Sequence, residues 1–293
     1  RPRHYETVLD LADLDRWLER IAAAELTAIA TTTTSPEPMT ANLVGLAFSI
    51  TPYAGCYVPL GHRYTGAPDQ LALELVLERL RPWLESPAHR KVGRNLKHDM
   101  HVLANHGVGF AGLEHDTLLQ AYVLEAHRNN APDALAARHL DRRVLTYQDV
   151  VGKGAKSIGF DQVEVGRATE YAAEVADVTL HLHQALFARI AAEPGLQRIY
   201  RDIEMPTSAA LQAMERHGVL IDARLLERQS DELGARLVAL EQQAYEAAGQ
   251  PFNLGSPKQL CEVLFVKLQL PVLKKTASGS PSTDEEVLEK LAE

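Results

Sequence analysis

The residues of this chain best suited to chemistry lie in two stretches with helical patterns. The first, residues 91–107, has the sequence KVGRNLKHDMHVLANHG and carries Asp99 one turn into its helical part. The second, residues 170–180, has the sequence EYAAEVADVTL, in which Tyr171 and Val175 share a face while Asp177 points elsewhere. A carboxylate in the first turns of a helix often only complements the helix dipole. Asp99 taken alone therefore favours a structural role, and the second stretch is what raises a catalytic one.

Two further patterns are compatible with ligand binding but favour ordinary structure. His98 and His101 are three residues apart on one helix and could converge on a transition metal, yet the pattern offers no further ligands. Gly152 and Gly154 flank Lys153 in a loop that lacks the Walker pattern of a phosphate cradle, so a simple turn is favoured.

The two helical stretches together resemble a known family. NLKHD is similar to the second motif, and YAAEVAD to the third motif, of the 3′–5′ proofreading exonuclease domain of bacterial family A DNA polymerases. The resemblance runs from Tyr5 to the end of the chain. It implies a site in which four carboxylates hold two Mg²⁺ or Mn²⁺ ions, about 4 Å apart, beside the last phosphodiester of a DNA strand. Such hard cations call for oxygen ligands.

The chain departs from the family pattern where the metal ligands are expected. The first family motif is Asp-Thr-Glu, and the aligned segment is TAIATTTT at residues 27–34, so that Ala30 stands for the Asp and Thr32 for the Glu. Val175 stands for the metal-binding Asp of the third motif. Asp99 and the water-orienting Tyr171 remain. The resemblance therefore predicts a degenerate metal site that binds neither Mg²⁺ nor Mn²⁺ and does not proofread.

The residues around the substituted ligand positions still match the family motifs, and this bears on how the ligands were lost. Long neutral drift would blur NLKHD and YAAEVAD as well as the ligand positions. A recent natural loss or a deliberate removal of proofreading fits the pattern better, and the sequence leaves these two open.

Hydrophobic periodicity predicts the elements that position these residues. The expected strands cover residues 5–9, 26–34, 43–51, 55–60 and 108–112, with a short β-like entry at 91–95. The expected helices among them cover residues 11–24, 68–85, 96–107 and 116–126. Strands alternating with helices predict an α/β layered sheet. The resemblance implies more closely a ribonuclease H-like exonuclease fold, a mixed sheet with flanking helices.

The second half of the sequence is predicted to be helical. Expected helices at 133–139, 147–152 and 163–189 precede a break at residues 193–195, Glu-Pro-Gly. This break gives the predicted domains, an exonuclease-like domain at 1–195 and an all-α segment at 196–293. Long helices follow at 197–217 and 223–249, with Asp222 as N-cap of the second and a leucine-rich face expected to be its core side. This part resembles the opening of the polymerase thumb, and the sequences PFNLGSPKQL and LKKTASGSPSTDEEVLEKL match its signatures.

Contacts with DNA are implied at two places. The thumb resemblance and the suitability of ammonium and hydroxyl groups for phosphate select Asn253, Lys274, Lys275, Thr276, Ser282 and Thr283. The old exonuclease cleft adds Asn95 and Lys97. A solvated loop that caps the helix from Asp284 explains Ser282 and Thr283 equally well.

Composition limits the partners and the compartment. Of 293 residues, 46% are hydrophobic and 24% charged, as in soluble globular proteins. Two separated cysteines, Cys56 and Cys261, favour a reducing compartment. The net charge of −9 argues against a surface that attracts DNA everywhere, so contacts must be local. No apolar run is long enough for a membrane span. The family resemblance implies a monomeric, cytoplasmic, nucleoid-associated bacterial protein that meets primer–template duplex and a single-stranded 3′ end. The start at Arg1 suggests a piece of a longer chain.

Three functions remain open from the sequence. The first is a catalytically silent exonuclease-fold domain with the thumb base, serving as a DNA-binding scaffold. The second is a residual metal-dependent exonuclease that uses Asp99, Tyr171 and a substitute ligand such as Thr32. The third is an interaction module with no role on DNA. Polymerisation is not expected, because the family's palm and fingers carboxylates are not among these residues.

Overall fold

The computed structural model describes residues 2–292, apart from the side chain of residue 155. The chain forms two compact units, Arg1–Gly218 and Val219–Glu293, each with its own internal contacts.

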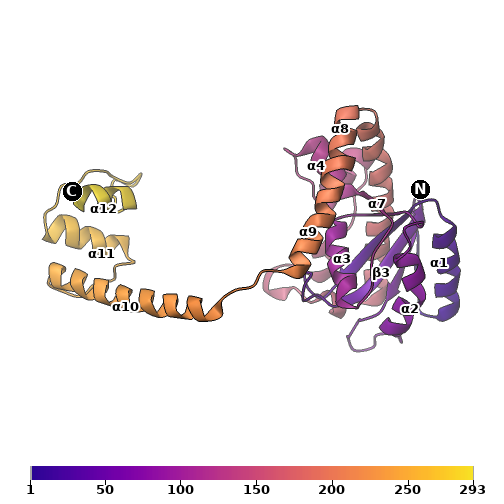
Figure 1. Ribbon diagram of the computed structural model, residues 1–293, viewed down its shortest axis with the longest axis horizontal. Helices are drawn as coiled ribbons and strands as arrows, with labels where there is room; N and C mark the ends of the chain where they lie inside the picture. The colour runs from indigo at the N-terminus through magenta and orange to yellow at the C-terminus, as the bar shows by residue number, and fades with distance from the viewer. Residues whose placement is uncertain (1, 293) are drawn as a thin grey trace. The chain divides into compact units, whose positions relative to one another are not determined.

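A six-stranded mixed sheet is the centre of the first unit (Figure 1). Its strands are β1 (His4–Thr7), β2 (Thr27–Thr33), β3 (Leu43–Thr51), β4 (Ala54–Pro59), β5 (Lys91–Gly93) and β6 (Leu113–Asp116), in the order β1-β4-β3-β2-β5-β6. The pairs β2–β3 and β3–β4 are antiparallel, whereas β1–β4, β2–β5 and β5–β6 are parallel. The first seven residues of β3 are all buried, because helices cover both faces of the sheet.

The two faces of the sheet carry different helices. On one face α1 (Leu11–Ala23), α2 (Leu73–Leu84) and α3 (Leu96–Asn105) share a core that includes Trp17, Leu80 and Leu103. On the other face α7 (Val165–Ala191) crosses β2, β3 and β4. Because strand side chains alternate, Ile29 of β2 joins the first core and Ala30 packs against the second.

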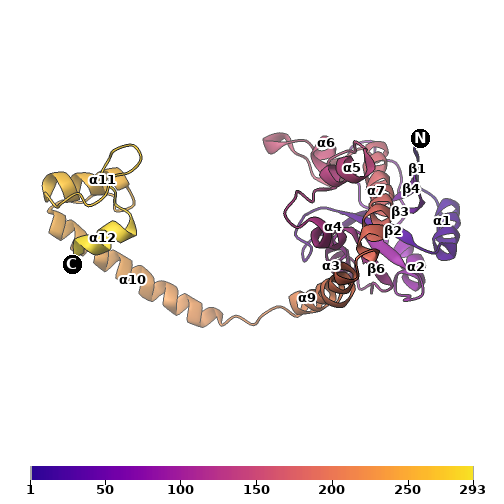
Figure 2. The ribbon, with the colours of Figure 1, turned by 90° about the horizontal axis from the view of Figure 1, so that it is seen from above.

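The remaining helices of the first unit pack on α7, on α3 or on one another (Figure 2). They are α4 (Thr117–Glu125), α5 (Pro132–Leu140), α6 (Tyr147–Val151), the short turns η1 (Gly154–Lys156) and η2 (Phe160–Gln162), α8 (Pro194–Arg198), the π-helical η3 (Ile199–Glu204) and α9 (Met205–His217). Tyr200 anchors η3, since its buried hydroxyl accepts hydrogen bonds from Asp116 N (3.0 Å) and Gln120 Nε2 (3.2 Å).

The second unit is helical. It contains α10 (Ala223–Ala248), α11 (Pro257–Cys261), the π-helical η4 (Glu262–Lys267) and α12 (Glu285–Ala292). Asp222 caps α10 as expected, accepting a hydrogen bond from Leu225 N (3.0 Å). The expected core face of α10 is not covered by the described residues, and Leu233, Leu237 and Leu240 are each at least half exposed.

Most expected elements are present, with local corrections. The prediction of a strand at 108–112 is wrong, because those residues form a loop. The strand that pairs with β5 is β6, at Leu113–Asp116. The helix expected from residue 68 begins at Leu73. The domain boundary at 195 stays a prediction, while the compact units divide after Gly218 because α8, η3 and α9 belong to the first unit. Within residues 2–292, none of the helices combines the length and the apolar content that a membrane crossing requires.

Candidate active site

Three elements carry the motif positions. Ala30 and Thr32 lie on β2, Asp99 on α3, and Tyr171 and Val175 on α7. These elements meet because α7 crosses β2 while α3 packs on the opposite face of the same strand. The family alignment made from the sequence therefore selects residues that the fold gathers around one strand.

A tight connection from β5 places α3. Gly93 permits it, because a Cβ at this position would lie 2.3 Å from Leu96 Cδ2. Asn95 follows in the left-handed conformation (φ 59°), which asparagine tolerates better than most residues. The first amides of the helix then reach Asp116, whose carboxylate accepts from Asn95 N (3.0 Å) and Leu96 N (2.7 Å). The buried carboxylate of Asp116 therefore caps the start of α3.

Thr32 belongs to a closed hydrogen-bond chain. Its hydroxyl donates to the hydroxyl of Tyr57 (2.9 Å) and lies 3.2 Å from Gly45 O. The Tyr57 hydroxyl in turn bonds His62 Nε2 (2.9 Å), and His62 Nδ1 lies 2.9 Å from Val163 O. Since a backbone carbonyl only accepts, Nδ1 of His62 carries the proton and Nε2 accepts from Tyr57. The position aligned with the family's Glu is therefore occupied by a neutral hydroxyl that is bonded to Tyr57.

Asp99 is held from the other side of β2. Thr31, the residue between the two substituted positions, donates its hydroxyl to Asp99 Oδ1 (2.6 Å). Burial raises the pKa of the Asp99 carboxyl, and hydrogen bonds from His98 and Thr31 oppose this only in part. Because side chains alternate along a strand, Thr31 and Asp99 bond on the face opposite Ala30 and Thr32. The retained acid and the Thr32 hydroxyl therefore belong to separate hydrogen-bond networks.

Tyr171 and Val175 lie along α7 at the spacing that shares a face. The ring of Tyr171 packs near Phe160 (centroids 5.8 Å apart) and edge-on to Tyr147 (6.2 Å). Burial raises the pKa of Tyr171 to about 12, so the phenol stays protonated near neutral pH. Val175 is partly buried and offers no donor atom to a cation.

The other acids of YAAEVAD have structural roles that the sequence does not reveal. Asp177 is fully buried and accepts from the Tyr5 hydroxyl (2.7 Å) and from Tyr53 N (2.8 Å). Its carboxylate also pairs with Arg142 (2.9 Å), which bonds Glu174 as well (3.1 Å). These partners overcome burial and lower the pKa of Asp177. Asp177 ties α7 to β1 and to the β3–β4 turn, and Glu174 ties it to Arg142 and to Leu145 N.

The donor set does not match the family's two cations. Among the described residues no group of three or more His, Cys, Asp or Glu side chains is placed to hold a metal ion. At the motif positions Asp99 supplies the single carboxylate, Ala30 and Val175 supply no side-chain oxygen, and Thr32 supplies a neutral hydroxyl. Two hard divalent cations require several oxygen ligands with enough negative charge to offset them.

Comparison with known proteins identifies the family. Residues 5–191 match the family model described as 3′–5′ exonuclease, and residues 223–293 match the model of DNA polymerase family A. The chain belongs to the 3′–5′ exonuclease family. The expected resemblance to bacterial family A DNA polymerase I and the expected fold class are therefore confirmed.

Individual relatives agree with this assignment. DNA polymerase I of Pseudomonas aeruginosa is 50% identical over 99% of this chain and 32% of its own length. That of Rhizobium leguminosarum is 39% identical over 98% of this chain and 30% of its own length. The solved polymerase domain of Pol1 from M. smegmatis, in complex with DNA primer-template and dNTP, superimposes with a TM-score of 0.74 at 27% identity, covering 97% of this chain and 45% of that one. The chain spans about a third of the length of these curated relatives.

The thumb-like residues of this exonuclease-family chain lie in a loop and in turns. Lys274 Nζ pairs with Asp284 (2.8 Å) and, more distantly, with Glu286 (3.8 Å). Lys275 forms an isolated antiparallel bridge with Pro281. The Thr276 hydroxyl bonds inside the turn that this bridge closes. The loop is therefore ordered by its own hydrogen bonds.

The other expected thumb contacts differ in availability. Ser282 is buried, and its hydroxyl accepts from Asp284 N (3.3 Å), while the helix that follows is capped by Asp284, which accepts from Val287 N (3.1 Å). Thr283 is partly buried. The side-chain oxygen of Asn253 accepts a hydrogen bond from Gly255 N (2.8 Å).

The two cleft residues also differ. Asn95 is exposed at the start of α3. Lys97 is paired with Glu215 of α9 (2.5 Å), a contact between residues far apart in the sequence that no local pattern predicts.

Proposed function

We propose that this chain is the part of a bacterial DNA polymerase I that holds DNA without digesting it. Residues 1–195 are its exonuclease-like domain, without a two-metal centre and without proofreading activity. Residues 196–293 are the start of the thumb. The observation that carries this proposal is that three of the four ligand positions are Ala30, Thr32 and Val175, while the fourth, Asp99, is buried and bonded to Thr31.

The chemistry of these positions argues against metal-assisted hydrolysis. Two metal ions clamp the attacking and leaving oxygens only where the protein offsets their charge. Asp99 brings at most one negative charge, and burial favours its neutral form. The Thr32 hydroxyl brings none, because a neutral oxygen does not offset the charge of a divalent ion. Tyr171, a neutral phenol, would still orient a water but has no activated water to orient.

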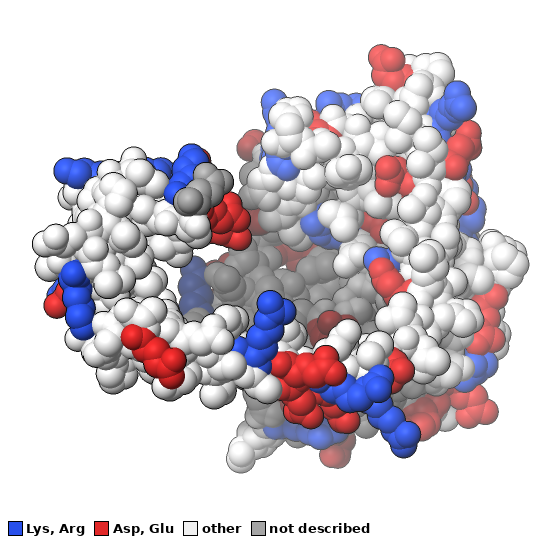
Figure 3. Space-filling model, turned by 60° about the vertical axis from the view of Figure 1, so that its left-hand side comes forward, with Lys and Arg blue, Asp and Glu red and all other residues white. Residues whose placement is uncertain are grey.

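The proposed partners are primer–template duplex on the thumb and a single-stranded 3′ end at the old cleft. Support comes from the M. smegmatis relative, whose structure contains primer-template DNA. Acidic and basic side chains of the described residues are interspersed on the face drawn in Figure 3, in keeping with the net charge of −9. Binding would then depend on a few phosphate contacts rather than on the overall field. A monomer in the bacterial cytoplasm, associated with the nucleoid, completes the proposal.

A digestion assay tests the loss of proofreading. A 5′-labelled single-stranded oligonucleotide incubated with this chain and Mg²⁺ or Mn²⁺ should keep its length. The control is Asp99→Ala, which removes the last family carboxylate. Shortening that is equal in both proteins marks a contaminating nuclease. Metal-dependent shortening that disappears in Asp99→Ala would refute the proposal and establish a residual exonuclease.

A binding titration tests the role on DNA. Weak affinity for duplex DNA that falls steeply as salt rises is expected, because phosphate contacts release counterions. Affinity for neither duplex nor single strand at low salt would favour a module that binds other partners.

A further inference from the structure

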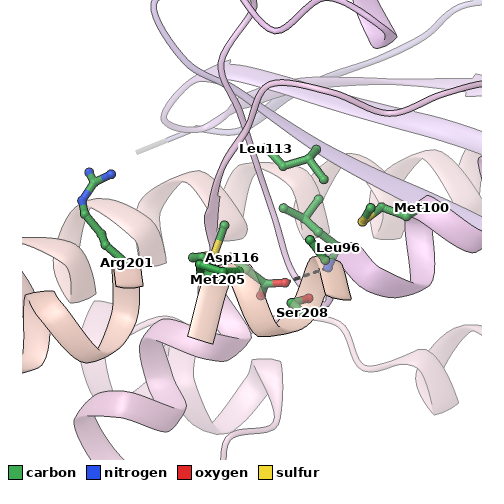
Figure 4. Close-up of a pocket in the computed structure, with 9 residues that line it drawn as sticks. Leu96, Met100, Leu113, Asp116, Arg201, Met205 and Ser208 are labelled. Carbon is green, nitrogen blue, oxygen red and sulfur yellow. Dashed lines mark hydrogen bonds between the residues drawn. The ribbon is translucent and has the colours of Figure 1, made fainter. Parts of the chain in front are cut away.

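Within the first unit, helix α9 contacts α3 and η3. None of its residues is fully buried, and its Leu211 and Met214 side chains are 41% and 67% exposed. Its first half does not fill the space beside α3. A pocket of about 260 Å³ remains there, lined among others by Leu96 and Met100 of α3 and by Met205 and Ala209 of α9 (Figure 4). Side chains that line a gap lose the dispersion contacts of close packing, so this half of α9 is weakly held.

The second half of α9 is held by a polar seam. Lys97, His101 and Asn105 follow one another at four-residue intervals and form one stripe along α3. Lys97 Nζ donates to Glu215 Oε1 (2.5 Å), and His101 Nε2 donates to Glu215 Oε2 (2.9 Å). Arg216 of α9 donates to Asn105 Oδ1 (2.7 Å).

Glu215 is the centre of this seam, because each of its carboxylate oxygens accepts from a different residue of α3. The bonds from Lys97 and then from His101 lower the pKa of Glu215, so the carboxylate stays ionised near neutral pH. His101 is 1% exposed, and its Nδ1 has no partner among the described residues. The bond to Glu215 therefore satisfies one ring nitrogen of His101, Nε2, which donates because a carboxylate only accepts.

We propose that α9 is a strap whose Glu215 carboxylate competes with phosphate for Lys97 and His101. When α9 lifts, the phosphodiester backbone of a single strand takes the donors that Glu215 releases. Carboxylate and phosphate oxygens accept from the same ammonium and imidazole donors with similar geometry. No residue of α9 itself is buried. The inference rests on the proposed function for the nature of the ligand.

The test compares single-strand binding by the full chain and three variants, using a fluorescein-labelled oligothymidylate at low salt. Glu215→Gln removes the competing charge. Glu19→Gln, on α1, removes the same charge from an exposed side chain with no ion pair among the described residues. We expect Glu215→Gln to bind about two- to fivefold more tightly than Glu19→Gln, the range that a partly exposed ion pair supports. The gain should vanish in the double variant Lys97→Ala/Glu215→Gln. Equal affinities for the two Gln variants, or a gain that survives without Lys97, would overturn the proposal.

Hydrogen exchange on the unmodified chain gives a second readout that needs no variant. Added oligothymidylate should speed the exchange of the backbone amides of residues 208–217, because the strand displaces α9. Amides that are protected or unchanged at saturation would show that α9 is not displaced. The same exchange measurement with inorganic phosphate at matched ionic strength shows whether a free anion displaces α9 as well as a strand does. Digestion and duplex binding, measured on the same proteins, test the proposed function without depending on whether α9 moves.

Discussion

The buried ammonium of Lys91 gives a prediction with a defined pH window. Lys91 opens the motif segment on β5 and is completely buried. Its Nζ donates to His89 O (2.7 Å) and Ser86 O (3.2 Å) and lies 4.4 Å from the ring centroid of Trp83. Burial lowers the pKa of Lys91 from 10.5 to about 8. Because the charged form is the costly one, folding at pH 7 includes a penalty of about 3 kcal/mol for this group.

The sign of the pH dependence follows from proton binding. Below pH 8 both the folded and the unfolded chain hold the proton on Lys91, and the penalty is complete. Between pH 8 and 10.5 the unfolded chain binds more protons, so the stability of the fold rises with pH. From pH 7 to pH 10 the expected gain is about 2.5 kcal/mol. Above pH 10 the raised pKa of buried tyrosines such as Tyr57 opposes it, because the unfolded chain then loses protons first.

The comparison variant is Lys91→Met, which keeps the length of the side chain but does not titrate. At pH 7 it loses the bonds to His89 O and Ser86 O while it avoids a buried charge, and these effects roughly cancel. The difference in unfolding free energy between wild type and variant should therefore shift by about 2.5 kcal/mol in favour of wild type from pH 7 to 10.

Urea unfolding followed by tryptophan fluorescence measures this difference. Both tryptophans, Trp17 and Trp83, lie in the first unit, so the signal reports the unit that contains Lys91. Tyrosine and histidine contributions are common to the two proteins and cancel. A difference that stays constant from pH 7 to 10 would refute the argument, since it would mean that Lys91 titrates normally or that water reaches its ammonium.

Three further predictions address the candidate site, the thumb-like loop and the buried histidines His115 and His183. Acids restored at the three substituted positions, by Ala30→Asp, Thr32→Glu and Val175→Asp, should bring back metal-dependent digestion of single strands; a folded but inert triple variant would show that the pocket has changed beyond its ligands. Lys275→Ala should flatten the salt dependence of duplex binding by about one phosphate contact, and Lys274→Ala by less, because Asp284 already neutralises Lys274; equal slopes for both variants and wild type would remove this loop from the interface. Burial lowers the pKa of His115 to about 3 and of His183 to about 4, so stability should fall as pH drops below 6.5, and less so in His115→Phe; parallel urea-unfolding curves would contradict this.

The sequence predicted the sheet and its covering helices because their signals are local. Strands β2, β3 and β4 are apolar runs bounded by turn residues, and α1 carries Leu14, Trp17 and Ile21 at helical spacing. Strand β6 was misplaced by a few residues. Its segment, LEHD, has a weak apolar signal, and its pairing with β5 decides its position. Register that depends on a partner strand is not readable from one segment.

The contacts of the candidate site were not predictable from the sequence. The family resemblance selected Ala30, Thr32 and Asp99, which the structure places on β2 and α3. The partners of these residues lie on other elements, such as Tyr57 on β4, 25 residues from Thr32 in the sequence. Lys97 was expected to face DNA, and its pairing with Glu215 spans 118 residues. Contacts at such separations arise from the tertiary fold, on which local patterns carry no information.

The structure also changes how the intact motif frames should be interpreted. Their survival beside lost ligands suggested a recent loss, on the assumption that the frames serve only catalysis. The buried Glu174 and Asp177 of YAAEVAD instead bind Arg142, and Asp177 also bonds Tyr5, so that they hold the edge of the sheet to α7. Removing one partner of a buried ion pair typically costs about 3–5 kcal/mol, a large part of the stability of an ordinary domain. Selection for a stable fold alone would preserve this frame. The side chains of Ala30 and Val175 can make no such contacts, so the intact YAAEVAD segment does not show when carboxylates would have been lost from these positions.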